Sequence, residues 1–342
     1  MSLNARWRTL LGFVLSAGLL VLTLYLGNVD PRDVWAHLRT ANVGLLLLAS
    51  AVATAIFPLR ARRWRTLLDP VAPGLPFGAL WRSTAIGMMV TNVVPARAGE
   101  LARAFALTRE TPRVPFTAAL ASIALDRVFD ACVVLLLMLV AMLDPSFPGD
   151  RVISSGWRVS SLVQLSAAVV VGAVTLLYLM VLFPQRVIGL YASLARRVAP
   201  RAERRGSELL ESFAGGLGAL RSAGRAAAVL GWTLAHWLTN ALAFWIAFRA
   251  VGIDAPFSAA LVLQGIVAIG VTIPAAPGFF GVFEAFSTAG LAIYGVPASL
   301  AVTWAIGFHI LSYIPITLMG GYYFARLGLR FGELRQAPQG AG

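Results

Sequence analysis

Six stretches of this sequence are long, apolar and almost free of charge. Each has about 17 residues or more, which is enough for a helix to cross the hydrocarbon core of a bilayer. Soluble domains carry about 25% charged residues, whereas only 13% of these 342 residues are charged and 58% are hydrophobic. The sequence therefore predicts an all-α polytopic membrane protein with about six transmembrane helices. The predicted spans are about 9–26, 43–59, 116–143, 160–183, 226–250 and 299–325.

The placement of arginine predicts which side of the membrane each connection occupies. All 28 basic residues are arginine, and the net charge is +13. Cytoplasmic connections carry an excess of basic residues. Here 17 arginines flank the spans on one side and five on the other, and the larger group includes Arg60, Arg62, Arg63 and Arg65. Both termini are therefore expected in the cytoplasm of a bacterial-type inner membrane, and the basic charge favours an anionic membrane surface over nucleic acid.

Two further hydrophobic segments are interrupted by proline and glycine and do not fit as simple spans. Residues 77–94 and 257–273 each end at a proline and are followed by a second apolar segment. Full crossings would make the flanking charges inconsistent, so each segment is interpreted as a re-entrant helical hairpin. Broken backbone at membrane depth is tolerated only where it is buried in protein or lines a wet cavity. The predicted breaks contain Pro95 and Gly99 in the first hairpin and Pro274, Pro277, Gly278 and Gly281 in the second.

The two interrupted segments also resemble each other. The first begins Pro76-Phe77-x-Ala79, the second begins Pro256-Phe257-x-Ala259, and both break at a Pro-Ala pair. The charge pattern has the first hairpin entering from the cytoplasm and the second from outside. Interrupted segments in corresponding positions of two halves point to a transport site near the midplane. The sequence therefore predicts an inverted repeat, with halves at about 43–143 and 226–325 and with hairpin tips that meet.

The remaining segments are expected to lie at the periphery of one transmembrane domain over residues 1–335. Residues 185–225 carry eight arginines and apolar residues at helical spacing. This pattern predicts one or two amphipathic helices on the anionic leaflet, which serve either to anchor the topology or to capture lipid. Residues 336–342 are expected to form a disordered tail.

Charged residues inside a span need partners or water and are candidates for function. Asp126 and Asp130 are four residues apart in the third predicted span, so they share a helix face. Arg127 can neutralise one of them, and a second arginine such as Arg97 or Arg103 is expected to pair with the other. The cluster is interpreted as a structural ion-pair network, as a lipid headgroup site, or as both.

Arg97 is the predicted phosphate ligand, because it lies at the first break. A helix N-terminus at such a break presents free N–H groups, and the arginine fork matches phosphate geometry. The alternative is that Arg97 only pairs with one of the two aspartates. The candidate lipid-binding residues are Arg97, Asn92, Glu100, Arg103, Asp126, Arg127, Asp130 and Glu284.

Three polar groups at depth are candidates for proton coupling, namely Glu284, His236 and His309. Glu100 and Glu284 each follow a break, where a carboxylate also stabilises the start of a helix. For each histidine, an interhelical hydrogen bond is the simpler interpretation.

The sequence carries no signature of catalysis. It lacks a Walker loop, a GxSxG elbow, an HExxH motif and a DxD-type sugar-nucleotide motif. Its single cysteine, Cys132, excludes a disulfide framework, and its three histidines lack metal-ligand spacing. No enzymatic activity, cofactor or metal is expected, so any transport must be passive, ion-coupled or driven by a partner.

Four motifs stand in order along the chain: Arg63-Trp64-x-x-Leu67-Leu68, Asn92-x-x-Pro95-x-Arg97-x-Gly99-Glu100-x-x-Arg103, Asp126-Arg127-x-x-Asp130, and the segment from Pro274 to Glu284. Together they resemble the flippase-like transmembrane domain of the lysylphosphatidylglycerol synthase family, and the resemblance covers about residues 10–325. The family often has Glu at the position of Asp126 and Gly where Phe279 or Phe280 stands.

The resemblance implies movement of an anionic phospholipid or polyprenyl-type lipid between leaflets. No aminoacyl-transferase domain follows Arg335, so lysyl transfer itself is not expected. The first hypothesis is a lipid flippase or transporter. The second is a non-transporting accessory subunit that presents lipid to a glycosyltransferase or another lipid-modifying partner. A soluble-anion transporter is a third alternative, and the cargo and the oligomeric state stay open.

Overall fold

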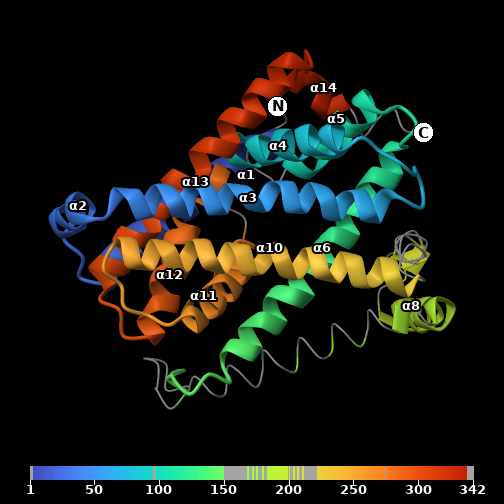
Figure 1. Ribbon diagram of the computed structural model, residues 1–342. Coiled ribbons are helices and arrows are strands. Elements are labelled where there is room, and N and C mark those ends of the chain that lie inside the picture. The colour runs from blue at the N-terminus through green and yellow to red at the C-terminus, as the bar shows by residue number, and fades with distance from the viewer. Residues whose placement is uncertain are drawn as a thin grey trace.

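The fold is built from helices that run past one another in several directions (Figure 1). The computed structural model describes residues 3–94, 98–149, 183–198, 222–273 and 275–336, with isolated positions between 168 and 211. All regular structure in these ranges is helical. Several predicted features lie outside the described residues: Pro95, Arg97, Pro274, most of the span at 160–183 and most of 199–221.

Two antiparallel helices, α3 (Val43–Leu68) and α10 (Ala223–Ala250), lie side by side along the bundle (Figure 1). The main-chain N–H of Asn42, which precedes α3, donates to the carbonyl of Ala250 at the end of α10. The Asn42 side chain caps α3 by accepting from the N–H of Leu45. The predicted span ended at residue 59, but α3 continues to Leu68 because its later turns are also buried in protein.

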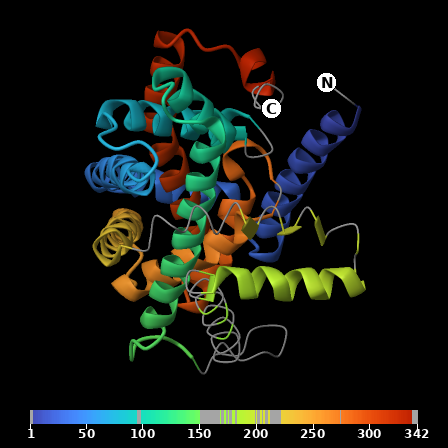
Figure 2. The same ribbon diagram turned by 90° about the vertical axis from the view of Figure 1, so that its right-hand side faces the viewer.

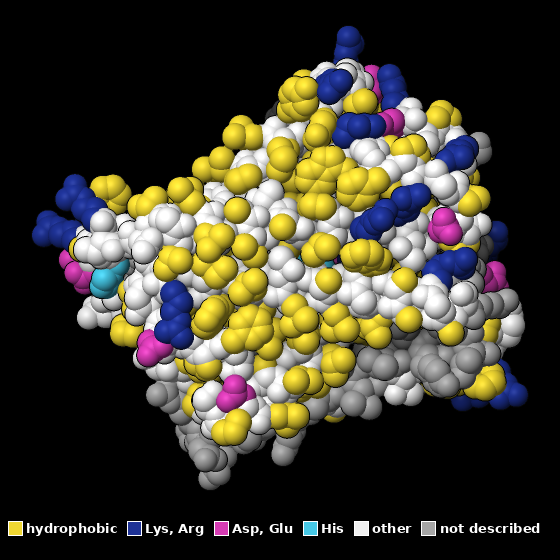
Figure 3. All heavy atoms as spheres, in the orientation of Figure 1, with side chains coloured by type: hydrophobic (Ala, Val, Ile, Leu, Met, Phe, Trp, Pro, Cys, Tyr) yellow, Lys and Arg dark blue, Asp and Glu magenta, His cyan; other side chains and the backbone are white. Residues whose placement is uncertain are grey.

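Two described helices, α3 and α13 (Ala298–Arg326), are long and apolar enough to cross a membrane. A third candidate is the bent pair formed by residues 12–26 and 31–40. The helices α6 (Phe116–Ala141) and α10 are as long, but they carry charged or polar residues within their length. Figure 3 shows an apolar middle over α3, α10 and α13, with charged side chains gathered toward the two ends of these helices.

The chain bends by 88° between α1 (Leu3–Leu26) and α2 (Pro31–Thr40). Asn28 adopts a positive φ of 47° at this bend, and the Asp30 side chain then caps α2 by accepting from the N–H of Arg32. The short helix α2 was not among the predicted elements. Its 10 residues are too few to bury a face alone, so α13 supplies the packing partner.

The first hairpin consists of α4 (Phe77–Val93) and α5 (Ala98–Glu110), and residues 95–97 between them lie outside the described residues. Two glycines allow these helices to touch. A Cβ on Gly99 would lie 2.2 Å from the carbonyl oxygen of Gly87, and a Cβ on Gly87 would lie 2.7 Å from the Cβ of Arg103. Such close backbone approach is typical of helices that pack through small residues.

The second hairpin consists of α11 (Phe257–Gly270), a short 3-10 turn η2 (Pro277–Phe279) and α12 (Val282–Ile293). The break contains Gly278 at φ +70° and Gly281 at φ +84°, a region of backbone conformation that favours glycine. The turn η2 packs against α4. The second break therefore lies against α4 of the first hairpin.

The two hairpins open toward opposite ends of α13. Trp81 in the first hairpin donates to the hydroxyl of Tyr323 near the end of α13. In contrast, the open end of the second hairpin lies at the end of α12, just before α13 begins. There the ring of Tyr294 packs on the ring of Phe147, which follows α6 in the chain. The helix α1 packs against α12 of the second hairpin, and Figure 2 shows it on the side of the molecule opposite α3 and α10.

Two helices lie at the periphery. The helix α8 (Pro184–Val198) runs across the direction of α6 (Figure 2), with Ile188 and Ala195 buried and Leu190 and Leu194 exposed. It falls in the segment predicted to form amphipathic helices. The helix α14 (Phe331–Gln336) includes Gln336, which was assigned to the disordered tail, and residues 337–342 lie outside the described residues.

Candidate functional site

Arg63, Asp126 and Asp130 form the centre of a buried ion-pair network between α3 and α6. The Nε of Arg63 lies 2.5 Å from Asp126 Oδ1, and its Nη1 lies 2.7 Å from Asp130 Oδ1. The side chains of Arg63 and Asp126 are fully buried. One guanidinium thus bridges two carboxylates that lie one turn apart on α6.

Aromatic packing fixes where α3 crosses the hairpin and α6. Trp64 is fully buried, and its indole N–H donates to Ser122 Oγ on α6 at 2.8 Å. The guanidinium carbon of Arg103, from α5, lies 3.9 Å from the centre of the Trp64 ring. This stacking places the Arg103 charge beside Asp126, with Nη1 3.2 Å from Oδ2.

Three arginines of the network keep N–H groups without an acceptor among the described residues, and in Arg63 this group is Nη2. Arg60 Nη2 lies 3.9 Å from Asp126 Oδ2, and its Nε donates to no described group. The Nε and Nη2 of Arg103 likewise have no hydrogen-bond acceptor among the described residues. Because buried polar groups are normally paired, these free donors indicate room for an added acceptor.

Arg127 and Glu100 form the exposed edge of the network. Arg127 Nε lies 2.7 Å from Glu100 Oε1, and its Nη1 lies 3.5 Å from Asp130 Oδ2. Their side chains are 45% and 38% exposed, unlike the buried centre. We define Arg60, Arg63, Arg103, Arg127, Glu100, Asp126 and Asp130 as the arginine cluster; it holds four cations and three anions.

The helix α10 closes the cluster on the Asp130 side. Trp237 Nε1 donates to Asp130 Oδ1 at 3.0 Å, and His236 Nδ1 lies 3.5 Å from the same oxygen. Thr233 accepts from Arg63 Nη1 at 3.1 Å. His236, predicted as a proton-coupling candidate, therefore faces the arginine cluster.

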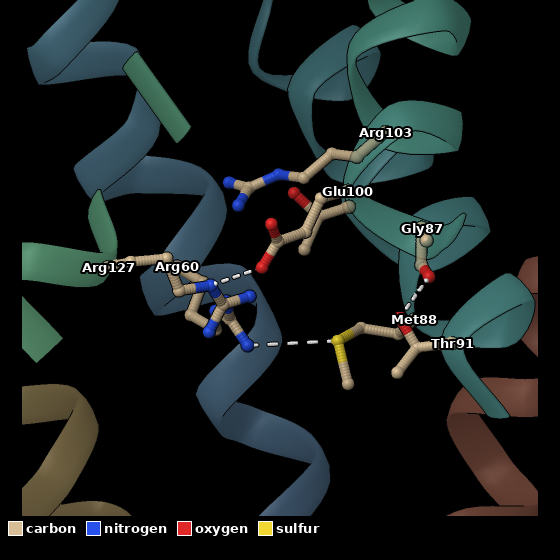
Figure 4. Close-up of a pocket in the computed structure, with 9 residues that line it drawn as sticks. Arg60, Gly87, Met88, Thr91, Glu100, Arg103 and Arg127 are labelled. Carbon is tan, nitrogen blue, oxygen red and sulfur yellow. Dashed lines mark hydrogen bonds and ion pairs between the residues drawn. The ribbon is translucent and has the colours of Figure 1, made fainter. Parts of the chain in front are cut away.

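A narrow polar pocket opens between the cluster and the first hairpin. Figure 4 shows Arg60 and Arg127 facing Glu100 and Arg103 across it, with Met88 and Thr91 on α4 along one side. The space open to water-sized molecules is about 10 Å³, which is room for roughly one water. A larger anion would enter only if the exposed Arg127–Glu100 pair moved aside.

A wider groove lies on the other side of the end of α4. The space in it that is open to water-sized molecules is about 470 Å³. The wall is mostly apolar and comes from α1, α4, the second break and α13: Phe13, Ser16, Ala17, Leu20, Asn92, Val93, Ala276, Pro277, Phe280, Gly281 and Tyr313. Thr91 lines the polar pocket and Asn92 the groove, so consecutive residues of α4 separate the two spaces.

Glu284 and His309 form a second buried polar pair behind the groove. His309 Nδ1 lies 2.7 Å from Glu284 Oε1, and His309 Nε2 lies 2.9 Å from the carbonyl of Gly278. Glu284 Oε2 also accepts from the N–H of Gly281 at 2.5 Å. Glu284 thus stabilises the start of α12, as a carboxylate after a break was expected to do, and in addition holds α13.

The structure separates the predicted site residues into two groups. Arg103, Arg127, Asp126, Asp130 and Glu100 lie in the arginine cluster, whereas Asn92 and Glu284 lie near the groove. The Asn92 side chain donates to Thr317 Oγ1 at 2.7 Å, and its carbonyl accepts from the Tyr313 hydroxyl. Arg97 lies outside the described residues.

Sequence reasoning missed Arg60 and Arg63 as members of the site, because both were counted as topology-setting cytoplasmic charges. They lie three residues apart, so they share a helix face on which Trp64, Leu67 and Leu68 are also buried. That apolar face, continuing past residue 59, was the signal that the helix extends and carries these arginines inward.

Comparison with known proteins identifies related chains. A family described as the lysylphosphatidylglycerol synthase TM region matches residues 9–320. Glycosyltransferase AglD of Haloferax volcanii is 26% identical over 332 residues, covering 89% of this chain and 51% of AglD. A UPF0104 membrane protein of Methanothermobacter thermautotrophicus is 23% identical over 313 residues, covering 84% of this chain and 85% of that protein. The chain thus spans about half the length of AglD.

The family match extends from α1 almost to the end of α13, so it includes both hairpins and the arginine cluster. It agrees with the resemblance carried by the four sequence motifs. The chain is an integral membrane protein that belongs to the lysylphosphatidylglycerol synthase TM region family.

Proposed function

We propose that this protein binds the anionic headgroup of a phospholipid or polyprenyl-phosphate-type lipid at the arginine cluster and moves the lipid between leaflets. The observation that carries the proposal is the excess of arginine over carboxylate, four against three, in a network whose centre is buried and keeps free guanidinium N–H groups. A phosphate needs such donors, because its charge cannot enter hydrocarbon uncompensated. The proposal assigns the chain no catalytic step.

The two spaces beside α4 fit the two parts of a lipid. The polar pocket offers Arg60 and Arg103 to a phosphate, and these planar forks can bind it through paired hydrogen bonds. The groove offers apolar side chains such as Phe13 and Leu20 to a hydrocarbon chain. In this proposal the exposed Arg127–Glu100 pair is the mouth of the headgroup pocket and opens for binding.

The proposed membrane arrangement has six crossings and two re-entrant hairpins of opposite orientation, with both termini in the cytoplasm of the inner membrane. Support comes from the arginine asymmetry and from hairpins that open toward opposite ends of α13. In a Cys132→Ser background, single cysteines at 70–75 should react with an impermeant maleimide only from the cytoplasm. Cysteines at 252–256 should react only from outside. Labelling of both segments from one side would contradict the arrangement.

Reconstitution into liposomes tests lipid movement. Purified protein should accelerate the exchange of a fluorescent anionic phospholipid between leaflets. Arg60→Gln should reduce the rate by about 10-fold or more, since a hydrogen bond to a charged group contributes about 1.5–3 kcal/mol. It should still fold, because Asp126 keeps Arg63 and Arg103 as partners.

The matched control for that experiment is Arg62→Gln, two residues along the same helix. Arg62 is exposed and outside the cluster, so Arg62→Gln should exchange lipid at the same rate as the unmodified protein. Equal rates for Arg60→Gln and Arg62→Gln would remove the arginine cluster from the transport path.

The second candidate function is presentation of a lipid-linked substrate to a glycosyltransferase. It is favoured by the match to AglD, a protein named as a glycosyltransferase of which this chain covers 51%. This alternative predicts headgroup binding without acceleration of lipid exchange in pure liposomes. A catalytic partner, either a separate lipid-modifying enzyme or part of a longer chain, would then act on the bound lipid.

A further inference from the structure

The pair formed by Glu284 and His309 has a hydrogen-bond pattern that fixes its proton content. The side chains of Glu284 and His309 are buried, at 3% and 10% exposure. The Gly278 carbonyl can only accept, so His309 Nε2 must carry a hydrogen. The Gly281 N–H can only donate, so Glu284 Oε2 must accept.

These two assignments leave His309 Nδ1 facing Glu284 Oε1 at 2.7 Å. Two lone pairs at this distance would repel each other, so one hydrogen must lie between them. It belongs either to a glutamic acid beside a neutral imidazole or to an imidazolium beside a carboxylate. In both cases the pair holds one dissociable proton and has no net charge.

The surroundings favour a neutral pair. The rings of Phe280 and Phe283 lie 4.3 and 4.4 Å from the His309 ring centre, and Tyr313 lies 6.3 Å away. No charged side chain among the described residues of α1, α4, α11 and η2 pairs with either group. The charged and titratable groups on helices packed against α13 have other places or partners. Arg60 and Arg63 belong to the arginine cluster, His236 faces it, and Arg82 on α4 pairs with Glu110. The remaining groups lie on α2 or at the end of α10, where Arg249 pairs with Asp254: Arg32, Asp33, His37, Arg39, Arg249 and Asp254.

We propose that Glu284 and His309 form a proton-binding site whose occupancy sets the shape of the groove. Loss of the proton would leave two acceptors in contact and a net negative charge among aromatic rings, so the pair would separate. Glu284 holds the N–H of Gly281 and His309 stacks on Phe280, and both of these residues line the groove. Separation of the pair would therefore move the groove wall.

The proposed link between the proton and lipid movement rests on the proposed function, whereas proton binding itself does not. If lipid moves through the groove, a proton gradient could drive it. In each transport cycle the pair of Glu284 and His309 would release its proton, which moves the groove wall at the second break. Uptake of a proton would then restore the original wall.

Glu284→Gln is the variant that isolates this effect. The glutamine oxygen can accept from Gly281, and its NH₂ group can donate to His309 Nδ1. The variant thus reproduces the hydrogen bonds of the protonated pair without a dissociable proton. It should fold as well as the unmodified protein.

The test measures the width of the groove as pH changes. Spin labels at Ala17 on α1 and Val93 on α4, both of which line the groove, are introduced in a Cys132→Ser background. Electron–electron double resonance then gives their distance distribution at a series of pH values between about pH 4 and pH 9. The unmodified pair should gain a second distance population as pH rises, and Glu284→Gln should keep a single population throughout.

Glu333→Gln, on the peripheral helix α14, serves as a control and should respond to pH like the unmodified protein. A distribution that stays constant in the unmodified protein, or one that shifts equally in Glu284→Gln, would overturn the proton site. A separate arm compares lipid exchange in liposomes with and without an imposed pH gradient. If no lipid moves under either condition, the proposed function fails while the distance measurement still decides the proton site.

Discussion

Arg63→Gln is expected to produce the largest loss of stability of any substitution in the arginine cluster. Arg63 is fully buried and bridges Asp126 and Asp130. Breaking a buried ion pair by removing one partner costs about 3–5 kcal/mol, a large part of a typical unfolding free energy of about 5–15 kcal/mol. The melting temperature of the purified protein in detergent should fall sharply, and the yield of folded protein should fall with it.

A second substitution tests the reason for this loss. Adding Asp130→Asn to Arg63→Gln removes one carboxylate, while Asp126 keeps Arg103 at 3.2 Å. The double variant should therefore recover a large part of the lost stability, as coupled residues do in a double-mutant cycle. The neighbouring Arg62→Gln should melt like the unmodified protein. If Arg63→Gln also melts normally, the network does not hold α3 against α6.

Gly281→Ala is expected to disrupt the second hairpin where α1 packs on it. A Cβ at this position would lie 2.1 Å from the carbonyl oxygen of Ser16, and Gly281 has a φ of +84°. Left-handed backbone costs an alanine about 1–2 kcal/mol, and overpacking adds about 1–3 kcal/mol. We expect a lower melting temperature and loss of lipid exchange, because the Gly281 backbone also lines the groove.

Gly74→Ala separates the cost of left-handed backbone from the cost of overpacking. Gly74 has a similar φ of +70°, but nothing lies within 4 Å of the Cβ position. Its substitution should therefore carry only the backbone cost and should leave lipid exchange intact. Equal melting temperatures for the two variants would show that the contact between α1 and the second break contributes nothing to stability.

The helical hairpins could be predicted because proline and glycine leave a strong local signal. Residues 77–94 were expected to end at Pro95, and α4 ends at Val93. The positive φ values at Gly278 and Gly281 also lie within the predicted second break. Local sequence determines these features, since only glycine adopts such a backbone without strain.

Long-range partners could not be predicted in the same way. His309 was a candidate for proton coupling, yet its bond to Glu284 joins α12 and α13 across 25 residues. Arg63 was assigned to the membrane surface because a run of arginines after an apolar stretch is typical of a cytoplasmic boundary. Its inward position follows from packing of Trp64 against Ser122 and Arg103, which depends on how three helices meet.

Binding of a phosphate-bearing lipid to the arginine cluster is the central claim, and a melting-temperature titration tests it most directly. A ligand that binds only the folded state raises the melting temperature as its concentration increases. Short-chain phosphatidic acid should stabilise the unmodified protein and Arg62→Gln, whereas diacylglycerol with the same chains, which can occupy only the groove, should stabilise both much less. The apparent affinity of Arg60→Gln for phosphatidic acid should be weaker by about 10-fold or more. Equal stabilisation of Arg60→Gln and Arg62→Gln by phosphatidic acid, or equal stabilisation by diacylglycerol, would contradict the claim.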